Sequence, residues 1–451
     1  MSNLPGEPLC THYPPGFPLL LSVVIYFFKE NIFLLQFEVA LLGFFSLFLV
    51  YKVLKRYTSP LFSFLCVLFL LFNRSFLHFS MQRILSDVPF LFFSLLSIFM
   101  CEKYLESKKT FNRNGLFLVI ALIMSFLVRY TGVFLFLGIF IVLILKKEYK
   151  KLKFVSILFL IIFFFWNLYS LSTSNPFAVS HLKGFLLINY YVPSQGTLLD
   201  YPLQVVFRFI DGWDFYSLLI FENIFPFLSV KLKSYISSFH FLPTIFILLG
   251  IWIVFKRNKY CAFQYYFLIY SLFLSVANHR ITGGGMRYLV PILPFVFLYF
   301  FVASRSVFRY MFKKFNNFIY FVMILILVLN ISVLHFRQPR YEILSPPWRN
   351  FIEIHKWINR NIKDKKSIIV SRKCTFTYFF TGHKSIIYPY TFDVEKIKEE
   401  IKKYKAKYII VDSFSWQTKV YLLPFLYKYR KNLKLLYRIG NTGIVEVIEK
   451  W

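Results

Sequence analysis

The feature that most constrains this chain is a series of long apolar segments that recurs through its first 335 residues. A helix needs about 20 apolar residues to cross the ~30 Å hydrocarbon core of a bilayer. Hydrophobic residues make up 58% of the 451 positions, and 61 positions are Phe. A soluble fold of this length cannot bury so much apolar surface. We therefore expect an α-helical multi-pass membrane protein, with about ten spans in the ranges 31–51, 58–72, 84–101, 115–128, 131–146, 152–171, 241–255, 262–277, 287–303 and 318–335.

The charge is strongly basic and unevenly distributed. The chain has 53 Lys and Arg against 21 Asp and Glu, a formal net charge of +32. The basic residues cluster in alternate loops between the apolar segments, most densely at 146–153. Cytoplasmic loops of membrane proteins carry such an excess. The pattern predicts an N-terminus, a 172–240 loop and a C-terminal region outside the cytoplasm, with membrane lipids and no nucleic acid as partners.

Three regions follow from the pattern of apolar segments. Residues 1–30 should hold an outer loop and an interfacial helix, because the apolar stretch Phe17–Phe28 is too short to cross a bilayer. Residues 31–335 should form the membrane domain, whose outer loop 172–240 contains an aromatic segment, Phe207–Phe221, that favours a helix on the membrane surface. Residues 341–451 contain no further span, so we expect a small soluble α/β domain on the extracytoplasmic side.

Within 341–451 the pattern alternates between helix and strand. Amphipathic spacing predicts helices at 348–362 and 394–404. Short apolar runs predict strands at 367–371, 385–388 and 408–412, and a terminal hairpin of 433–438 and 443–448 turns at Gly440-Asn441.

Metal and redox chemistry have no clear sequence signature. The five cysteines form no CxxC pair, so neither a zinc site nor a disulfide framework is indicated. No HExxH motif, nucleophile elbow or acidic pair stands in the expected outer loops. We predict no metal ligand, while the cofactor is unknown and dependence on a divalent metal stays open.

Polar residues gather at the outer ends of the expected spans. Polar groups at membrane depth are costly, so their positions are functional candidates. Arginine suits a phosphate ligand, because its planar fork of donors matches two oxygens at once. The candidates are His12, Tyr13, Arg83, Asp87, Arg129, Tyr130, Arg287 and Tyr288.

Two structural explanations compete with a functional one. Ser86-Asp87 followed by Pro89 is also a good helix N-cap. The pairs Arg129-Tyr130 and Arg287-Tyr288 are also typical of interfacial anchors that reach lipid head groups. Both explanations stay open from the sequence alone.

Four of these segments, taken in order, resemble the motifs of one family. They are Thr11–Leu21, Ser86–Phe92, Val128–Gly132 and Gly285–Pro294. The chain resembles the GT-C fold membrane glycosyltransferases, which include protein mannosyltransferases that use dolichyl-phosphate-mannose and bacterial aminoarabinose and galacturonosyl transferases of lipid A. The resemblance extends over nearly the whole chain, including the C-terminal domain.

The resemblance implies a donor, a mechanism and a location. A polyprenyl-phosphate sugar would be the donor, and a hydroxyl of a glycan, lipid or protein would attack its anomeric carbon on the extracytoplasmic face. Arg129 and Arg287 would hold the lipid phosphate, and His12 and Tyr13 would line the cleft. Asp87 matches an acidic position of the family and is, with Glu7, a catalytic candidate. Arg83, Tyr130 and Tyr288 join the donor-site candidates. We expect a bacterial plasma membrane, with an organelle lumen as the alternative outer compartment.

One departure concerns the catalytic base. Members of the family begin with a cytoplasmic N-terminus and a first span, followed by an outer loop that carries a carboxylate base. This chain begins inside that loop, where Glu7 is the candidate carboxylate. We expect a truncated record that lacks the first span, with the true base upstream of Met1, so whether the chain as given is active stays open. A start codon assigned too late and an unusual role for Glu7 are the alternatives.

Two other functions stay open. A transporter or flippase of a lipid-linked sugar would bind the same ligand without chemistry. Transporters tend to show internal repeats and polar sites at the bilayer midplane, whereas this chain shows no repeat and its polar residues lie near one surface. The other alternative is a structural or assembly protein whose soluble domain binds a partner.

Overall fold

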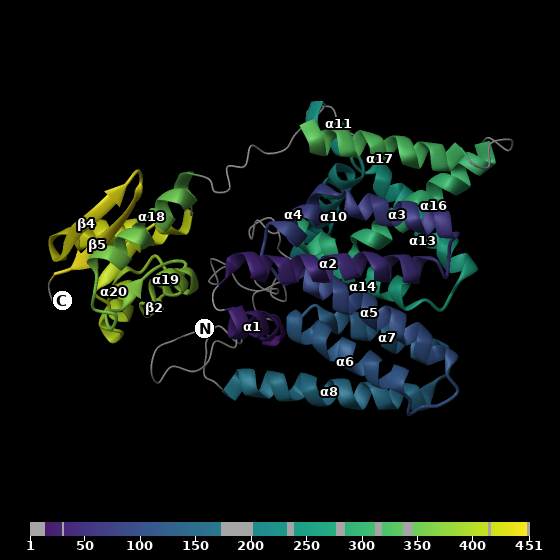
Figure 1. The fold of residues 1–451 in the computed structure, drawn as a ribbon, viewed down its shortest axis with the longest axis horizontal. Helices are drawn as coiled ribbons and strands as arrows, with labels where there is room; N and C mark the ends of the chain where they lie inside the picture. Colours follow the sequence, from purple (N-terminus) through teal and green to yellow (C-terminus); the bar gives the residue numbers. More distant parts are fainter. Residues whose placement is uncertain are drawn as a thin grey trace. The chain divides into compact units, whose positions relative to one another are not determined.

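The structure is a computed structural model, and it describes residues 14–28, 31–172, 202–231, 239–276, 285–311, 318–336, 346–413 and 416–448. These residues form two units, one within 12–337 and one within 338–451. The first is made of helices and the second combines helices with a sheet (Figure 1).

A helix lies in each of the ten ranges where a span is expected. These helices are α2 (Ile32–Leu54), α3 (Pro60–Leu71), α5 (Asp87–Glu106), α6 (Arg113–Val128), α7 (Gly132–Leu145), α8 (Tyr149–Ser172), α13 (Leu242–Arg257), α14 (Ala262–Val276), α16 (Leu293–Met311) and α17 (Phe318–Phe336). The remaining described helices of this unit are α1 (Gly16–Phe28), α4 (Arg74–Met81), α10 (Pro202–Ile224), α11 (Pro226–Lys231) and α15 (Gly285–Leu289), which a 3₁₀ turn, Val290–Ile292, joins to α16.

Several helices have the length and composition of membrane spans. In the described part of the chain, four helical segments can each cross a membrane: α2, α5, α8 and the run 285–311. The pair α3 and α4 is bent by 62° at a short break and would make a fifth. The apolar helices α1, α6, α7, α14 and α17 are shorter. The protein is therefore an integral membrane protein by composition, and the count of ten spans stays a prediction.

The exposed faces of the bundle are apolar, as lipid requires. On α2, four phenylalanines lie on one face and are each more than half exposed: Phe33, Phe37, Phe44 and Phe48. Their spacing of four, seven and four residues keeps them on one side of a helix. Such a face would be unfavourable in water, so it supports the assignment of α2 to the membrane.

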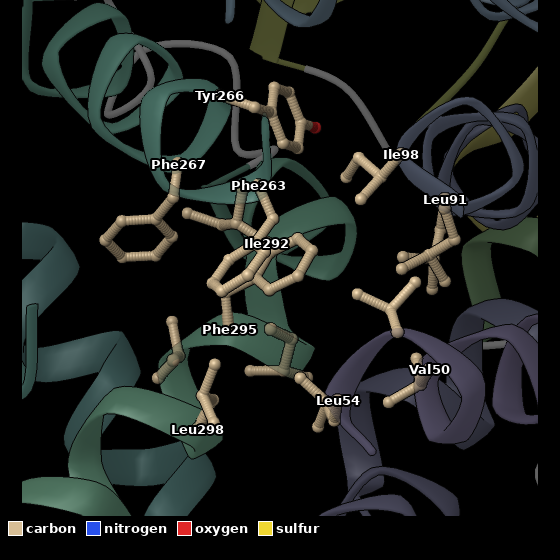
Figure 2. Packing of buried hydrophobic residues seen from close by; sticks show 14 of the residues in the cluster. Val50, Leu54, Leu91, Ile98, Phe263, Tyr266, Phe267, Ile292, Phe295 and Leu298 are labelled. Atoms are coloured by element: carbon tan, nitrogen blue, oxygen red, sulfur yellow. The ribbon is translucent and has the colours of Figure 1, made fainter. Parts of the chain in front are cut away.

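One part of the bundle core brings together four helices that are distant in sequence. Figure 2 shows side chains of α2, α5, α14 and α16 meeting in one cluster, among them Val50, Leu91 and Phe263. The rings of Phe263 and Phe295 stack with centroids 5.2 Å apart. Figure 1 shows α5, α6, α7 and α8 side by side. This packing fixes the helix ends, where the candidate site lies.

The second unit contains a mixed five-stranded sheet. Its strands are β1 (Ile369–Val370), β2 (Ser385–Ile386), β3 (Tyr408–Val411), β4 (Leu433–Ile439) and β5 (Thr442–Val447), in the order β2-β1-β3-β5-β4. β1 pairs in parallel with β2 and β3, while β5 pairs antiparallel with β3 and β4. Its helical elements are α18 (Pro346–Asn361), α19 (Cys374–Thr381), α20 (Val394–Lys403), a π-helical turn (Thr418–Leu422), α21 (Leu423–Lys428) and a 3₁₀ turn (Arg430–Asn432).

Alternation along β3 divides the core of this unit between the two faces of the sheet. Ile410 packs with Phe351 and Ile354 of α18. Its neighbour Ile409 packs in a separate cluster with Ile397 of α20 and Phe425 of α21. Successive side chains of a strand point to opposite faces, so the apolar run predicted at 408–412 is a strand buried on both sides.

Candidate active site

The centre of the candidate site is Asp87, whose carboxylate binds two arginines. Arg129 donates from Nη1 to Oδ1, and Arg287 donates from Nε to Oδ2 at 3.1 Å. The Asp87 side chain is 0% exposed, that of Arg129 is 11% exposed and that of Arg287 is 36% exposed. Two guanidinium groups and one carboxylate leave a net positive charge, and Arg287 is the member of the cluster that presents most of it to the surroundings.

Three helix ends supply these residues. Asp87 is the first residue of α5, Arg129 follows the last residue of α6, and Arg287 lies in the short helix α15. Arg129 has extended backbone angles, which end α6 and turn the chain toward α7. A Cβ on Gly132 would lie 2.6 Å from the backbone nitrogen of Phe126, so this tight turn requires glycine. The Arg-Tyr-Thr-Gly motif therefore positions the arginine.

The segment Thr11–Leu21, the first of the four that resemble family motifs, packs against the turn between α6 and α7. A Cβ on Gly16 would lie 2.6 Å from the backbone carbonyl carbon of Leu127, so the start of α1 packs directly on the end of α6. Only a residue without a side chain permits this approach. Gly16, in the described part of the segment Thr11–Leu21, thus contacts Leu127, which lies two positions before Arg129 in the sequence.

Aromatic rings surround the Arg129 guanidinium. Its central carbon lies 5.1 Å from the ring centroid of Tyr288 and 6.0 Å from that of Phe90. A cation over a ring face is stabilised by the ring quadrupole. Tyr288 therefore belongs to the arginine cluster, as its place beside Arg287 in the sequence predicted.

The other predicted residues differ in their surroundings. Arg83 is exposed and donates from Nε to His78 Nε2 at 3.2 Å, apart from the Asp87 carboxylate. The Tyr130 hydroxyl accepts from the Trp166 indole at 2.9 Å, which directs it toward α8. Glu7, His12 and Tyr13 lie outside the described residues.

The structure separates the two explanations of Ser86-Asp87. Ser86 precedes α5 with helical backbone angles and its side chain makes no capping hydrogen bond. The Asp87 carboxylate is engaged by arginines 42 and 200 residues away in sequence. The Asp87 side chain therefore holds helices together instead of capping α5.

Sequence reasoning missed the polar groups that α10 and α14 contribute near the cluster. Tyr270 of α14 is fully buried, with its ring centroid 6.5 Å from that of Phe90. Within the described ranges, its hydroxyl meets no hydrogen-bond partner. The Asn223 amide of α10 donates to Met286 Sδ at 3.0 Å, beside Arg287. A tyrosine or asparagine in an apolar helix is itself a signal, since buried polar groups need a reason.

A metal site was not predicted. Among the residues that the structure describes, no group of three or more His, Cys, Asp or Glu could hold a metal ion.

Comparison with known proteins identifies the fold. Residues 12–169 match the family model for dolichyl-phosphate-mannose-protein mannosyltransferase. The structure is similar to ArnT from Cupriavidus metallidurans bound to undecaprenyl phosphate, with a TM-score of 0.56 and 11% identity over 97% of this chain and 88% of ArnT. The chain has the GT-C glycosyltransferase fold.

A second similarity to this GT-C fold comes from an archaeal protein. The oligosaccharyltransferase AglB from Archaeoglobus fulgidus, in complex with an inhibitory peptide and a dolichol-phosphate, matches with a TM-score of 0.56 and 11% identity. That match covers 98% of this chain and 66% of AglB. No curated protein matches the chain in sequence. The matched family segment 12–169 contains Asp87 and Arg129, while Arg287 lies beyond it.

Proposed function

We propose that this protein is a glycosyltransferase that moves a sugar from a polyprenyl-phosphate donor to an acceptor hydroxyl on the extracytoplasmic face of a membrane. The fold supports this proposal, because the similar ArnT structure is bound to undecaprenyl phosphate and the AglB complex contains a dolichol-phosphate. The family model that matches residues 12–169 describes an enzyme that uses dolichyl-phosphate-mannose.

The observation that carries the proposal is the surplus of arginine around Asp87. When a sugar leaves a polyprenyl phosphate, negative charge grows on the departing phosphate oxygen, and preorganised cations stabilise it. The Arg287 Nε is engaged by Asp87, while its two terminal amino groups make no hydrogen bond to a described residue. Those amino groups form a fork that can bind two phosphate oxygens.

Asp87 acts in this proposal as a positioning residue. Both of its oxygens bind arginines and it is shielded from solvent, so an acceptor hydroxyl cannot reach it as a base. It holds the two guanidinium groups at the two oxygens of one carboxylate. Glu7 stays a candidate carboxylate, and a glycan, lipid or protein hydroxyl stays the predicted acceptor.

The test measures release of lipid phosphate. The purified protein in lipid nanodiscs receives undecaprenyl phosphate linked to mannose or to aminoarabinose, together with membrane extract as a source of acceptor. Arg287→Ala should lower release at least about tenfold, since it removes a charge-assisted contact to the leaving group. Arg113→Ala is the matched control, because Arg113 is an exposed arginine at the start of α6, at the other end of that helix from Arg129.

Two results would overturn the proposal. Equal release by both variants would remove the arginine cluster from the mechanism. Tight binding of undecaprenyl phosphate by the unaltered protein, with no release from either donor, would favour transport of a lipid-linked sugar instead.

The sidedness is tested separately. Fusions after residue 451 to alkaline phosphatase and to green fluorescent protein report opposite compartments in a bacterial host. We expect an active phosphatase fusion and a dark fluorescent fusion, because the basic loops predict a C-terminal unit outside the cytoplasm. The reverse pattern would move the reaction to the cytoplasmic face.

A further inference from the structure

A second basic site lies at the opposite end of the bundle from Asp87. A cavity of about 170 Å³ opens between α13 and α16, with Tyr57 on its wall. The Tyr57 hydroxyl donates to Glu102 at 2.6 Å. Glu102 and Asp87 lie on the same helix, 15 residues apart, which is roughly 22 Å along its axis. The cavity is therefore separate from the candidate active site, at the end that the sequence predicts to be cytoplasmic.

The cavity is lined by positive charge. Arg257, Arg305 and Arg309 are exposed on its walls, and no carboxylate lies among the lining residues. Within the described part of the chain, none of these arginines forms an ion pair. Glu102 is the carboxylate that Tyr57 brings nearby, and it already pairs with Arg56 at 3.2 Å. Several guanidinium groups without a counter-charge around one small cavity are complementary to an anion such as phosphate.

An apolar groove continues from this cavity. It has a volume of about 380 Å³ and shares Arg257 and Ser306 with the basic cavity. Its other walls include Leu249, Ile253 and Val307, with Trp252 60% exposed beside them. From Arg257 to Leu249 the groove follows eight residues of α13, roughly 12 Å along the helix. A free phosphate ion would gain nothing from apolar walls, whereas an acyl chain would bury apolar surface against them.

From this juxtaposition we infer that the cavity binds the phosphate head group of an anionic phospholipid, with one acyl chain in the groove between α13 and α16. Basic pockets between membrane helices on the cytoplasmic side recognise anionic head groups in this way. The site does not depend on the proposed sugar transfer, because it uses none of the residues around Asp87.

The experiment is native mass spectrometry of the full chain, released from detergent with phosphatidylglycerol or phosphatidylcholine present. We expect phosphatidylglycerol to stay bound and phosphatidylcholine to be lost. The double variant Arg305→Gln/Arg309→Gln should weaken phosphatidylglycerol binding by roughly 25-fold, as about fivefold is expected for each arginine. The double variant Arg113→Gln/Lys150→Gln removes the same charge from exposed positions at the same end of the bundle, outside the cavity, and should bind as the unaltered protein does.

Other outcomes contradict the inference. Equal weakening by the two double variants would show a non-specific attraction to basic loops. Equal retention of phosphatidylglycerol and phosphatidylcholine would show that the charge of the head group does not matter. If glycerol 3-phosphate displaced bound phosphatidylglycerol as efficiently as a second lipid does, the cavity would be a site for free phosphate esters. Arg257→Gln is an independent variant, because Arg257 lines both the basic cavity and the apolar groove. It should weaken phosphatidylglycerol binding about fivefold, and it tests the inference even if the double variant fails to fold.

Discussion

The two ends of α5 each bury a carboxylate, but the partners of the two carboxylates differ. Asp87 is 0% exposed and binds two arginines, Arg129 and Arg287. Glu102 is 6% exposed and binds one arginine, Arg56, and one phenol, Tyr57. The first cluster keeps a net positive charge. In the second, Arg56 also pairs with Glu106 at 2.8 Å, and Glu106 lies 3.9 Å from Lys103, so two acidic and two basic side chains balance.

The difference in charge balance distinguishes a ligand site at Asp87 from a purely structural contact at Glu102. A buried ion pair contributes little net stability, because desolvation of its charges offsets their attraction. A balanced ion pair such as that of Glu102 with Arg56 needs no further counter-charge. An extra arginine at Asp87 adds desolvation without a counter-charge, so stability alone does not explain it. An anionic ligand would supply the missing charge.

The largest expected effect is that of Asp87→Asn. This variant removes the negative charge between the two arginines and leaves the largely buried Arg129 guanidinium without its carboxylate partner. Loss of one partner from a buried ion pair costs about 3–5 kcal/mol of unfolding free energy. Thermal unfolding in detergent, followed by tryptophan fluorescence, would measure it. Ser86→Ala is the control and should change stability by less than about 0.5 kcal/mol, since its side chain makes no capping hydrogen bond.

An intermediate effect is expected from Glu102→Gln at the other end. The amide oxygen still accepts from Tyr57, while the charge toward Arg56 is lost. We expect a loss of about 1.5–3 kcal/mol of unfolding free energy, as for hydrogen bonds to charged groups. The same unfolding measurement checks this value, and sugar transfer should be unchanged. If Glu102→Gln abolished transfer without loss of stability, the contrast between the two ends would disappear.

The smallest expected effect on stability is that of Arg287→Lys. The charge is kept, and the side chain is 36% exposed, so unfolding should change by less than about 1 kcal/mol. A lysine has no planar fork, so undecaprenyl phosphate should bind about tenfold more weakly. Equilibrium binding in nanodiscs measures this change. Unaltered affinity would indicate that Arg287 acts only as a partner of Asp87.

The helices were largely predictable, and their bends were not. Apolar runs of adequate length predicted a helix in each expected range, because lipid requires internally satisfied backbone hydrogen bonds. The break between α3 and α4 was missed. There the Asn73 side chain accepts from the backbone nitrogens of Ser75 and Phe76 and starts a new helix. Arg74–Met81 is too short for a span, so hydropathy gives it no signal.

The sequence predicted which residues belong to the candidate site, but it did not predict the contacts between them. Residues Asp87, Arg129, Arg287 and Tyr288 were selected because polar groups at span ends are costly, and the structure brings them into contact. Tyr130 was selected for the same reason but bonds to Trp166. A position in sequence fixes which end of a helix a residue occupies, while the direction of its side chain depends on neighbouring helices.

The apolar segments, the basic loops between them and the set of polar residues at their ends were predictable from the amino-acid sequence, because hydrophobic length and charge are local properties. The packing of the helices shows in addition that one carboxylate joins two arginines 42 and 200 residues away, and that three further arginines line a cavity between α13 and α16. Contacts across such distances depend on how helices pack, and packing is set by the complementary shapes of many side chains together.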